Sequence, residues 1–227
     1  MILKSAAVGP FFKNGFVVGC ERTRQAVFID PGDEVDQLLS FIETEQLHVT
    51  HILLTHAHVD HVSGVAEAKR VLGAPIYLHK DDLFLYQNAV RTGMMFGLTV
   101  EEPPPVDHFY EGPFDVAHGR PITFGDYEVR VLHTPGHCPG GVCLALSKKG
   151  AAGAPSLFVG DTLFAGSIGR TDLPGGDYDT LLKAITGVLF AFPDESMVYS
   201  GHGPETTIGR ERSTNPFVLE YLTTNPS

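Results

Sequence analysis

The stretch Thr55-His56-Ala57-His58-Val59-Asp60-His61 places three imidazoles and a carboxylate within six residues, directly after a short apolar run typical of a buried strand. In an extended loop His56 and His58 point the same way, so one ion can bind both. Asp60 and His61, at the start of a following helix, can turn toward a neighbouring ion. Burying these groups without partners is unfavourable. The stretch therefore predicts a metal site.

Three more donor residues each follow a predicted strand. His137 comes after the rigid turn Pro135-Gly136, Asp161 ends an apolar run, and His202 lies between two glycines. The loops beyond strand ends are where an α/β scaffold assembles its site. A single histidine is more often a surface or hydrogen-bonded core residue, but seven such positions together favour a metal centre. Nitrogen and carboxylate ligands suit zinc, and also iron or manganese.

Apolar periodicity predicts two strand-rich halves with helices between them. Helical spacing covers 34–44 and about 68–72, and Asp177 can cap a helix running to about 190. We expect an α/β fold with two sheets and outer helices, an αββα sandwich, although periodicity alone does not distinguish it from other α/β folds. The expected strands are 1–5, 16–18, 26–29, 51–54, 74–78, 122–124, 129–132, 142–146, 157–159 and 197–199.

Residues 89–115 differ in character, because they combine Gly93, Met94, Met95 and Phe96 with three consecutive prolines. We expect this stretch to be irregular. It is either a lid over the site or a surface excursion packed on the core. The two methionines and Phe96 accordingly form an apolar wall over the site or pack in the core.

Composition narrows the class of protein. With 227 residues, 43% of them hydrophobic, the chain can bury a sizeable core, and we expect one domain over 1–227. The formal charge of −11 disfavours nucleic-acid binding. No apolar run is long enough to suggest a membrane span. Three cysteines are few and odd in number, and no signal peptide is evident, so we expect a reducing, cytoplasmic location.

The H-x-H-x-D-H run, with His137, Asp161 and His202, resembles the metallo-β-lactamase superfamily over essentially the whole chain. Within it, the chain looks most like the glyoxalase II-like (hydroxyacylglutathione hydrolase-like) branch, in its small bacterial form without the C-terminal helical domain. The segments that carry this likeness are 166–172, 201–206 and 211–217.

The resemblance implies an αββα fold with two metal ions per chain, zinc first, with iron or manganese possible. Asp161 would bridge the two ions. By this likeness the first ion is held by His56, His58 and His137, and the second by Asp60, His61 and His202.

The activity that the resemblance implies is hydrolysis of a thioester such as S-lactoylglutathione, with Asp60 and Asp161 as catalytic residues. Two ions sharing Asp161 would lower the pKa of a bound water toward neutrality, which makes hydroxide available. The leaving thiol has a pKa of about 8.5, so no strong general acid is required.

Other functions stay open. Persulfide dioxygenases resemble the same branch and hold a single iron by two histidines and a carboxylate, here His56, His137 and Asp161, to act on glutathione persulfide. The identity of the metal ligands does not distinguish persulfide dioxygenase activity from hydrolysis, although His202 favours hydrolysis. Secreted zinc β-lactamases fit less well, and a non-catalytic module is disfavoured because no ligand is missing.

Substrate contacts are less defined. The helical domain that binds glutathione in glyoxalase II is expected to be absent, so Arg170, Arg210 and Arg212 are candidates to meet an anionic substrate. Structural salt bridges explain these arginines at least as well. Cys138, next to His137, is either a reactive thiol or, the better explanation, a small packing residue.

Overall fold

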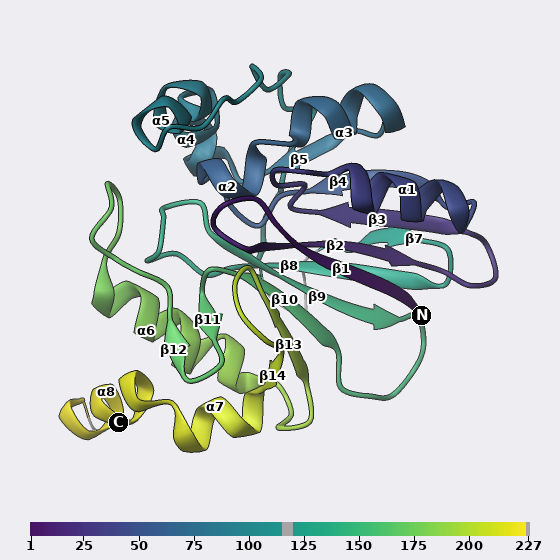
Figure 1. Cartoon of the computed structure of the whole chain (residues 1–227). Helices are drawn as coiled ribbons and strands as arrows, with labels where there is room; N and C mark the ends of the chain where they lie inside the picture. Colours follow the sequence, from purple (N-terminus) through teal and green to yellow (C-terminus); the bar gives the residue numbers. More distant parts are fainter. Residues whose placement is uncertain (115–119, 226–227) are drawn as a thin grey trace.

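Two six-stranded sheets pack face to face in the computed structural model, which describes residues 1–114 and 120–225 (Figure 1). The first sheet runs in sequence order, with its last three strand pairs parallel. It comprises β1 (Ile2–Val8), β2 (Lys13–Gly19), β3 (Gln25–Ile29), β4 (His48–Leu53), β5 (Ile76–Leu78) and β6 (His108–Phe109).

The second sheet is built from the second half of the chain and is antiparallel except where β10 pairs with β13. Its order is β14 (Thr206–Thr207), β13 (Met197–Ser200), β10 (Ser156–Gly160), β9 (Val142–Lys148), β8 (Tyr127–His133) and β7 (Ile122–Phe124). A small separate hairpin consists of β11 (Leu163–Phe164) and β12 (Ser167–Ile168).

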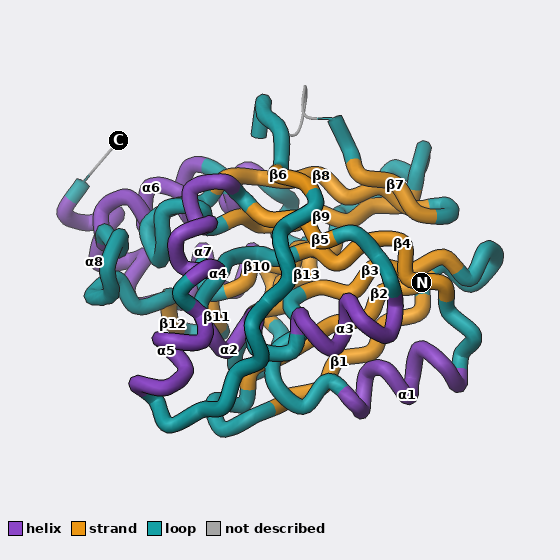
Figure 2. Tube along the Cα trace, turned by 90° about the horizontal axis from the view of Figure 1, so that it is seen from above, coloured by secondary structure: helices purple, strands orange, loops and turns teal. Residues whose placement is uncertain are grey.

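Helices cover the outer faces of both sheets, as Figures 1 and 2 show. The αββα prediction is confirmed. Among the described residues, no helix has the length and apolarity that crossing a membrane requires. The helices on the side of the first sheet are α1 (Asp36–Thr44), α2 (Val59–Val62), α3 (Val65–Leu72), the 3₁₀ helix η1 (Lys80–Asp82), α4 (Leu83–Gln87) and α5 (Ala89–Met95). Those on the side of the second sheet are α6 (Tyr178–Gly187), the 3₁₀ helix η2 (Leu189–Ala191), α7 (Ile208–Thr214) and α8 (Pro216–Thr224).

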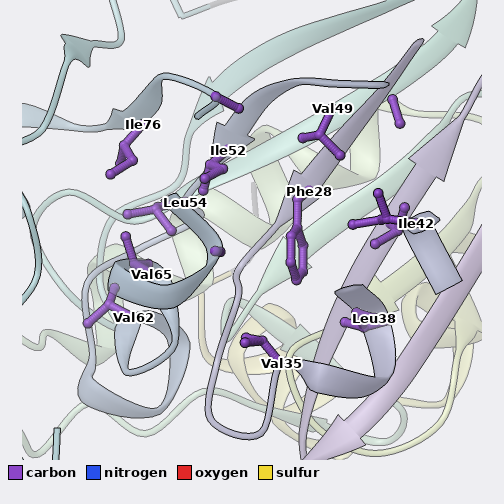
Figure 3. Close-up of a cluster of buried hydrophobic side chains, with 14 of the residues drawn as sticks. Phe28, Val35, Leu38, Ile42, Val49, Ile52, Leu54, Val62, Val65 and Ile76 are labelled. Carbon is purple, nitrogen blue, oxygen red and sulfur yellow. The ribbon is translucent and has the colours of Figure 1, made fainter. Parts of the chain in front are cut away.

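Alternation along the strands divides the buried side chains among three apolar layers. In β3, Phe28 packs with the helices outside the first sheet, whereas Val27 and Ile29 face the second sheet. In β10, Phe158 lies between the sheets, and its neighbour Leu157 packs toward the outer helices. Figure 3 shows Phe28 among the apolar side chains of the outer layer of the first sheet.

Loops at the ends of four strands converge at one edge of the sandwich. The amide of Val142 on β9 donates to the carbonyl of Thr55, just beyond β4, over 2.8 Å. The Gly201 amide, after β13, donates to the Gly160 carbonyl at the end of β10 over 2.8 Å. These hydrogen bonds join the loops that carry the predicted donor residues.

Helix α5 corrects the expectation that 89–115 is irregular, because its first seven residues are helical. Met94 and Met95 end this helix and are 71% and 78% exposed, so the core-packing alternative for them is wrong. Residue 115, at the end of the stretch, lies outside the described residues. The predicted cap of α6 is confirmed, since the Asp177 carboxylate accepts from the Thr180 amide over 2.7 Å.

Candidate metal centre

His56, His58 and His137 form a first group of donor atoms, all within 4.8 Å of one another. His58 Nδ1 lies 2.8 Å from His137 Nε2, and both rings lie edge-on to the His56 ring with centroids 4.9 Å away. His56 and His58 lie in the loop between β4 and α2, and His137 follows β8. The structure thus joins residues far apart in sequence into one three-imidazole group.

Asp60, His61 and His202 form a second group. Asp60 Oδ2 lies 3.1 Å from His202 Nε2 and 3.9 Å from His61 Nε2. Asp60 and His61 are neighbours on the single turn of α2, while His202 follows β13. The second group therefore also combines one segment from each sheet.

The Asp161 carboxylate lies between the two groups. Its Oδ1 is 3.3 Å from His61 Nε2, and its Oδ2 is 3.5 Å from His202 Nε2 and 3.7 Å from His137 Nε2. Each oxygen thus has access to imidazole nitrogens, and the residue contacts members of both groups. The seven predicted donors form one continuous cluster.

Buried atoms without partners show that this cluster fits a metal. Among the described residues, His56 Nε2, His61 Nε2 and Asp161 Oδ1 are buried and have no hydrogen-bond partner. Leaving such atoms unsatisfied typically costs about 1–3 kcal/mol each. A divalent cation would satisfy all three, and imidazole and carboxylate donors suit zinc, iron or manganese.

Burial keeps two members of the first group, His56 and His58, uncharged. Burial, reinforced by the neighbouring histidines, holds the pKa of His56 well below its ordinary value. The same causes, led by burial and His137, lower the pKa of His58 to about 4. Both imidazoles are therefore neutral at pH 7, and a neutral imidazole is the form that binds metals.

The second group has the opposite electrostatics. Although burial opposes it, the charges of Asp161, Asp30 and Asp60 raise the pKa of His61 to about 10. Burial likewise opposes ionisation of Asp60 and Asp161, yet His61 and its neighbours lower the pKa of both carboxyls. These carboxylates stabilise the protonated, positively charged form of a buried imidazole. The same negative charges would stabilise a metal cation at this place.

Asp30 supports the second group by binding the nitrogen of His61 that faces away from the other donors. Its buried carboxylate accepts from His61 Nδ1 over 2.9 Å and from the Thr55 amide and hydroxyl over 2.7 and 2.6 Å. A carboxylate on the far nitrogen of a ligating histidine fixes the ring and leaves the other nitrogen free for metal. The sequence signal for this role was the turn Asp30-Pro31-Gly32 after a strand, which by itself does not point to His61.

Asp82 connects the two loops of the first group. Its carboxylate accepts from the Ala57 amide over 3.1 Å, the Gly140 amide over 2.6 Å and the Cys138 thiol over 3.1 Å. Cys138 is fully buried, and burial holds its pKa well above the ordinary value, which favours the packing explanation over a reactive thiol. Nothing in the local sequence around Asp82 indicated this role.

Gly201 is required where it stands. A Cβ atom there would overlap Asp161 Oδ1 and lie 2.6 Å from His61 Cε1. The backbone just after β13 can approach the centre this closely only without a side chain. The glycines that flank His202 in the sequence thus include one with a steric role.

Two of the three arginines proposed to meet substrate, Arg170 and Arg212, have local partners. Arg170 pairs with the exposed Asp172 over 2.7 Å, and its carbonyl accepts from His137 Nδ1 over 2.7 Å. Arg212 pairs with Asp194 and donates to the carbonyls of Phe190 and Phe192 over 2.6 and 3.1 Å. These contacts are the ones expected if Arg170 and Arg212 form structural salt bridges. The substrate role of Arg170, Arg210 and Arg212 stays a prediction.

Comparison with known proteins gives a consistent picture. The model of the metallo-beta-lactamase superfamily matches residues 8–202. The hydroxyacylglutathione hydrolase GloC of Haemophilus influenzae is 36% identical, and the match covers 86% of this chain and 88% of GloC. The probable metallo-hydrolase YqgX of Bacillus subtilis is also 36% identical, covering 93% of this chain and 94% of YqgX.

Solved structures agree with the fold. The BLEG-1 B3 metallo-beta-lactamase superimposes with a TM-score of 0.83 at 36% identity, covering 96% of this chain and 99% of BLEG-1. TTHA1623 in a di-iron-bound form gives 0.79 at 40% identity, covering 94% of this chain and 99% of that protein. ETHE1 from Myxococcus xanthus gives 0.74 at 26% identity, covering 99% of this chain and 91% of ETHE1.

Proposed function

The chain belongs to the metallo-beta-lactamase superfamily, and from that premise we propose that it is a binuclear metallohydrolase that cleaves a thioester. The substrate would be a small molecule, a glutathione thioester such as S-lactoylglutathione. The observation that carries the proposal is the position of Asp161, whose two oxygens face imidazoles of both donor groups.

In this proposal His56, His58 and His137 hold the first ion, and Asp60, His61 and His202 hold the second, with Asp161 shared. The di-iron form of TTHA1623 supports two ions in a chain of this kind. When bound, such ions supply Lewis acidity, which lowers the pKa of water and polarises a carbonyl. Zinc is our first choice, and iron or manganese would suit the same donors.

The residues of the chain prepare the centre for this chemistry. The lowered pKa values of Asp60 and Asp161 keep both carboxylates ionised at neutral pH, and we assign them as the catalytic carboxylates that bind metal and orient water. His56 and His58 stay neutral, so their lone pairs are available without loss of a proton. Asp30 and Asp82 hold the donor segments in place.

Hydrolysis forms a C–O bond at the acyl carbon and breaks its C–S bond. The acid product gives its proton to solvent, and the sulfur leaves as a thiolate. Because a thiol has a pKa of about 8.5, the thiolate leaves without a strong general acid. The homologue named hydroxyacylglutathione hydrolase supports a thioester as the substrate class.

A second candidate is persulfide dioxygenase chemistry at one iron, held by His56, His137 and Asp161. The likeness to ETHE1 is compatible with this candidate as well as with the first. The complete second group of donors weighs against it, because a single ion would leave Asp60, His61 and His202 without a metal ion to bind.

The test is metal content followed by paired assays. Protein purified without chelators should hold about two ions per chain and hydrolyse S-lactoylglutathione, and Asp161→Ala should lose metal and activity together. Lys80→Met, which replaces an exposed residue outside the donor cluster, is the control. Two ions with full activity in Asp161→Ala would refute the shared-ligand assignment.

Two further assays separate the alternatives. One iron per chain with oxygen uptake on glutathione persulfide would establish the dioxygenase instead. A β-lactam is included because BLEG-1 is named as a B3 metallo-beta-lactamase. Turnover of the β-lactam without turnover of any thioester would overturn the proposal.

A further inference from the structure

Five large apolar side chains are exposed in two segments far apart in sequence. We call them the apolar rim: Phe11 and Phe12, between β1 and β2, and Met94, Met95 and Phe96, at the end of α5. Their exposure lies between 39% and 78%. Contiguous exposed apolar surface typically marks a place where a partner or ligand binds.

The two segments of the rim touch each other. The rings of Phe11 and Phe96 meet edge to face, with centroids 5.8 Å apart and planes at 87°. This contact joins the loop between β1 and β2 to the residue that follows α5, so the two segments of the rim lie side by side. An aromatic pair of this geometry contributes stability beyond its buried area, which holds both segments in place.

The rim adjoins the metal centre. His202 Nδ1 donates to the Phe11 carbonyl over 3.0 Å, so the rim begins one side chain away from the donor atoms. The Phe164 ring also lies edge-on to His202, with centroids 6.1 Å apart, and adds a second aromatic neighbour to this histidine. On the α5 side, the helix packs against α2, which carries Asp60 and His61 (Figure 1).

We propose that the rim receives the acyl chain of the substrate, and that the enzyme prefers thioesters with apolar acyl groups longer than lactoyl. This inference rests on the proposed function. His202 contacts the backbone of Phe11, whose ring packs on Phe96, so an acyl substituent that leaves the donor atoms on this side would meet apolar side chains. The five rim side chains carry no charge, so an aliphatic chain suits them better than the carboxylates of glutathione.

The experiment measures kcat/KM for thioesters of one small neutral thiol, N-acetylcysteamine, with acetyl, butanoyl, hexanoyl and octanoyl groups. This choice makes the result independent of the thiol carrier. Full burial of a methylene increases binding affinity about fourfold. Because the rim would cover only one side of the acyl chain, we expect kcat/KM to increase about twofold per methylene.

Variants then assign the preference to the rim. Phe96→Ser and Phe11→Ser should each lower the octanoyl-to-acetyl ratio of kcat/KM by about fivefold or more. Val71→Ser is the matched control, because Val71 is 61% exposed on α3 and should leave the ratio unchanged. Thermal unfolding of each variant establishes that it is folded.

The outcomes are distinct. A flat series in a protein that hydrolyses every thioester would overturn the substrate preference alone, and so would hydrolysis of S-lactoylglutathione with no turnover of the series. Turnover of neither the series nor S-lactoylglutathione would overturn the proposed function itself. A sloping series that the rim variants leave unchanged would also overturn the role of the rim. If the protein is a dimer that Phe96→Ser converts to monomer with the series unaltered, the rim is a surface for a second copy, and the proposal is wrong.

Discussion

Lys13 places a positive charge in the interior, close to the carboxylates of the centre. It is 1% exposed, and its ammonium group donates to the carbonyl of Asp30. Asp30 has a φ of 48°, in the left-handed region that non-glycine residues rarely adopt. The lysine therefore stabilises an unusual backbone conformation in the residue that orients His61.

The buried lysine should give a measurable pH dependence. Burial lowers its pKa to about 8, although Asp30, Asp60 and Asp161 act in the opposite direction. In the unfolded chain a lysine has a pKa of about 10.4, so between these values the unfolded state binds more protons and stability rises with pH. Relative to Lys13→Met, the wild-type protein should gain roughly 3 kcal/mol between pH 8 and 10.5.

Urea unfolding of both proteins across this pH range is the measurement. The exposed Lys80→Met provides the control, and its stability should follow that of the wild type. Parallel curves for the wild type and Lys13→Met would show that the native pKa of Lys13 is ordinary.

Among the secondary-structure elements, the junction of η1 and α4 has a role larger than its length. Asp82 lies there and accepts hydrogen bonds from the amides of Ala57 and Gly140, each in a loop that carries first-group donors. The junction of these two short helices thus fixes the distance between the Ala57 loop of the first sheet and the Gly140 loop of the second sheet.

Replacement of that carboxylate should loosen the junction. In Asp82→Asn the amide nitrogen cannot accept a hydrogen bond, so a buried backbone N–H loses its partner at a cost of about 1–3 kcal/mol. Asp81→Asn, one residue earlier and exposed, is the matched control. Urea unfolding measures both variants, and equal stabilities would contradict the bridging role.

The elements that could be predicted from sequence are those with a local signal. The short apolar run 26–29 marked β3, and the dense run from His56 to His61 marked the donor cluster. Asp82 could not be found this way, because its contact with Gly140 spans 58 residues and depends on tertiary packing. Helix α5 was missed because the glycine and prolines of its stretch indicate irregular structure more strongly than its first residues indicate a helix.

For the molecule as a whole, the proposed ions would contribute directly to folding stability. They would bind only the folded chain, because the seven donors come together from both sheets. At a metal concentration about 1,000 times Kd the gain is about 4 kcal/mol, which for a chain of this size raises Tm by roughly 8–16 °C.

Calorimetry of loaded, chelator-treated and reloaded protein measures this effect. The chelated sample should unfold at the lower temperature and recover on reloading, while Asp161→Ala should show no dependence on metal. A Tm that chelation leaves unchanged would mean that the folded chain does not gain stability from these ions.

The division of the donors between the sheets has a mechanical consequence. Each group contains residues from the first half of the chain and from the second, so each ion would link the two halves through its ligands. Neither half alone could close either coordination shell. Separating the sheets, whether by force or by denaturant, would therefore release the metal in the same step, and metal release would report directly on the opening of the sandwich.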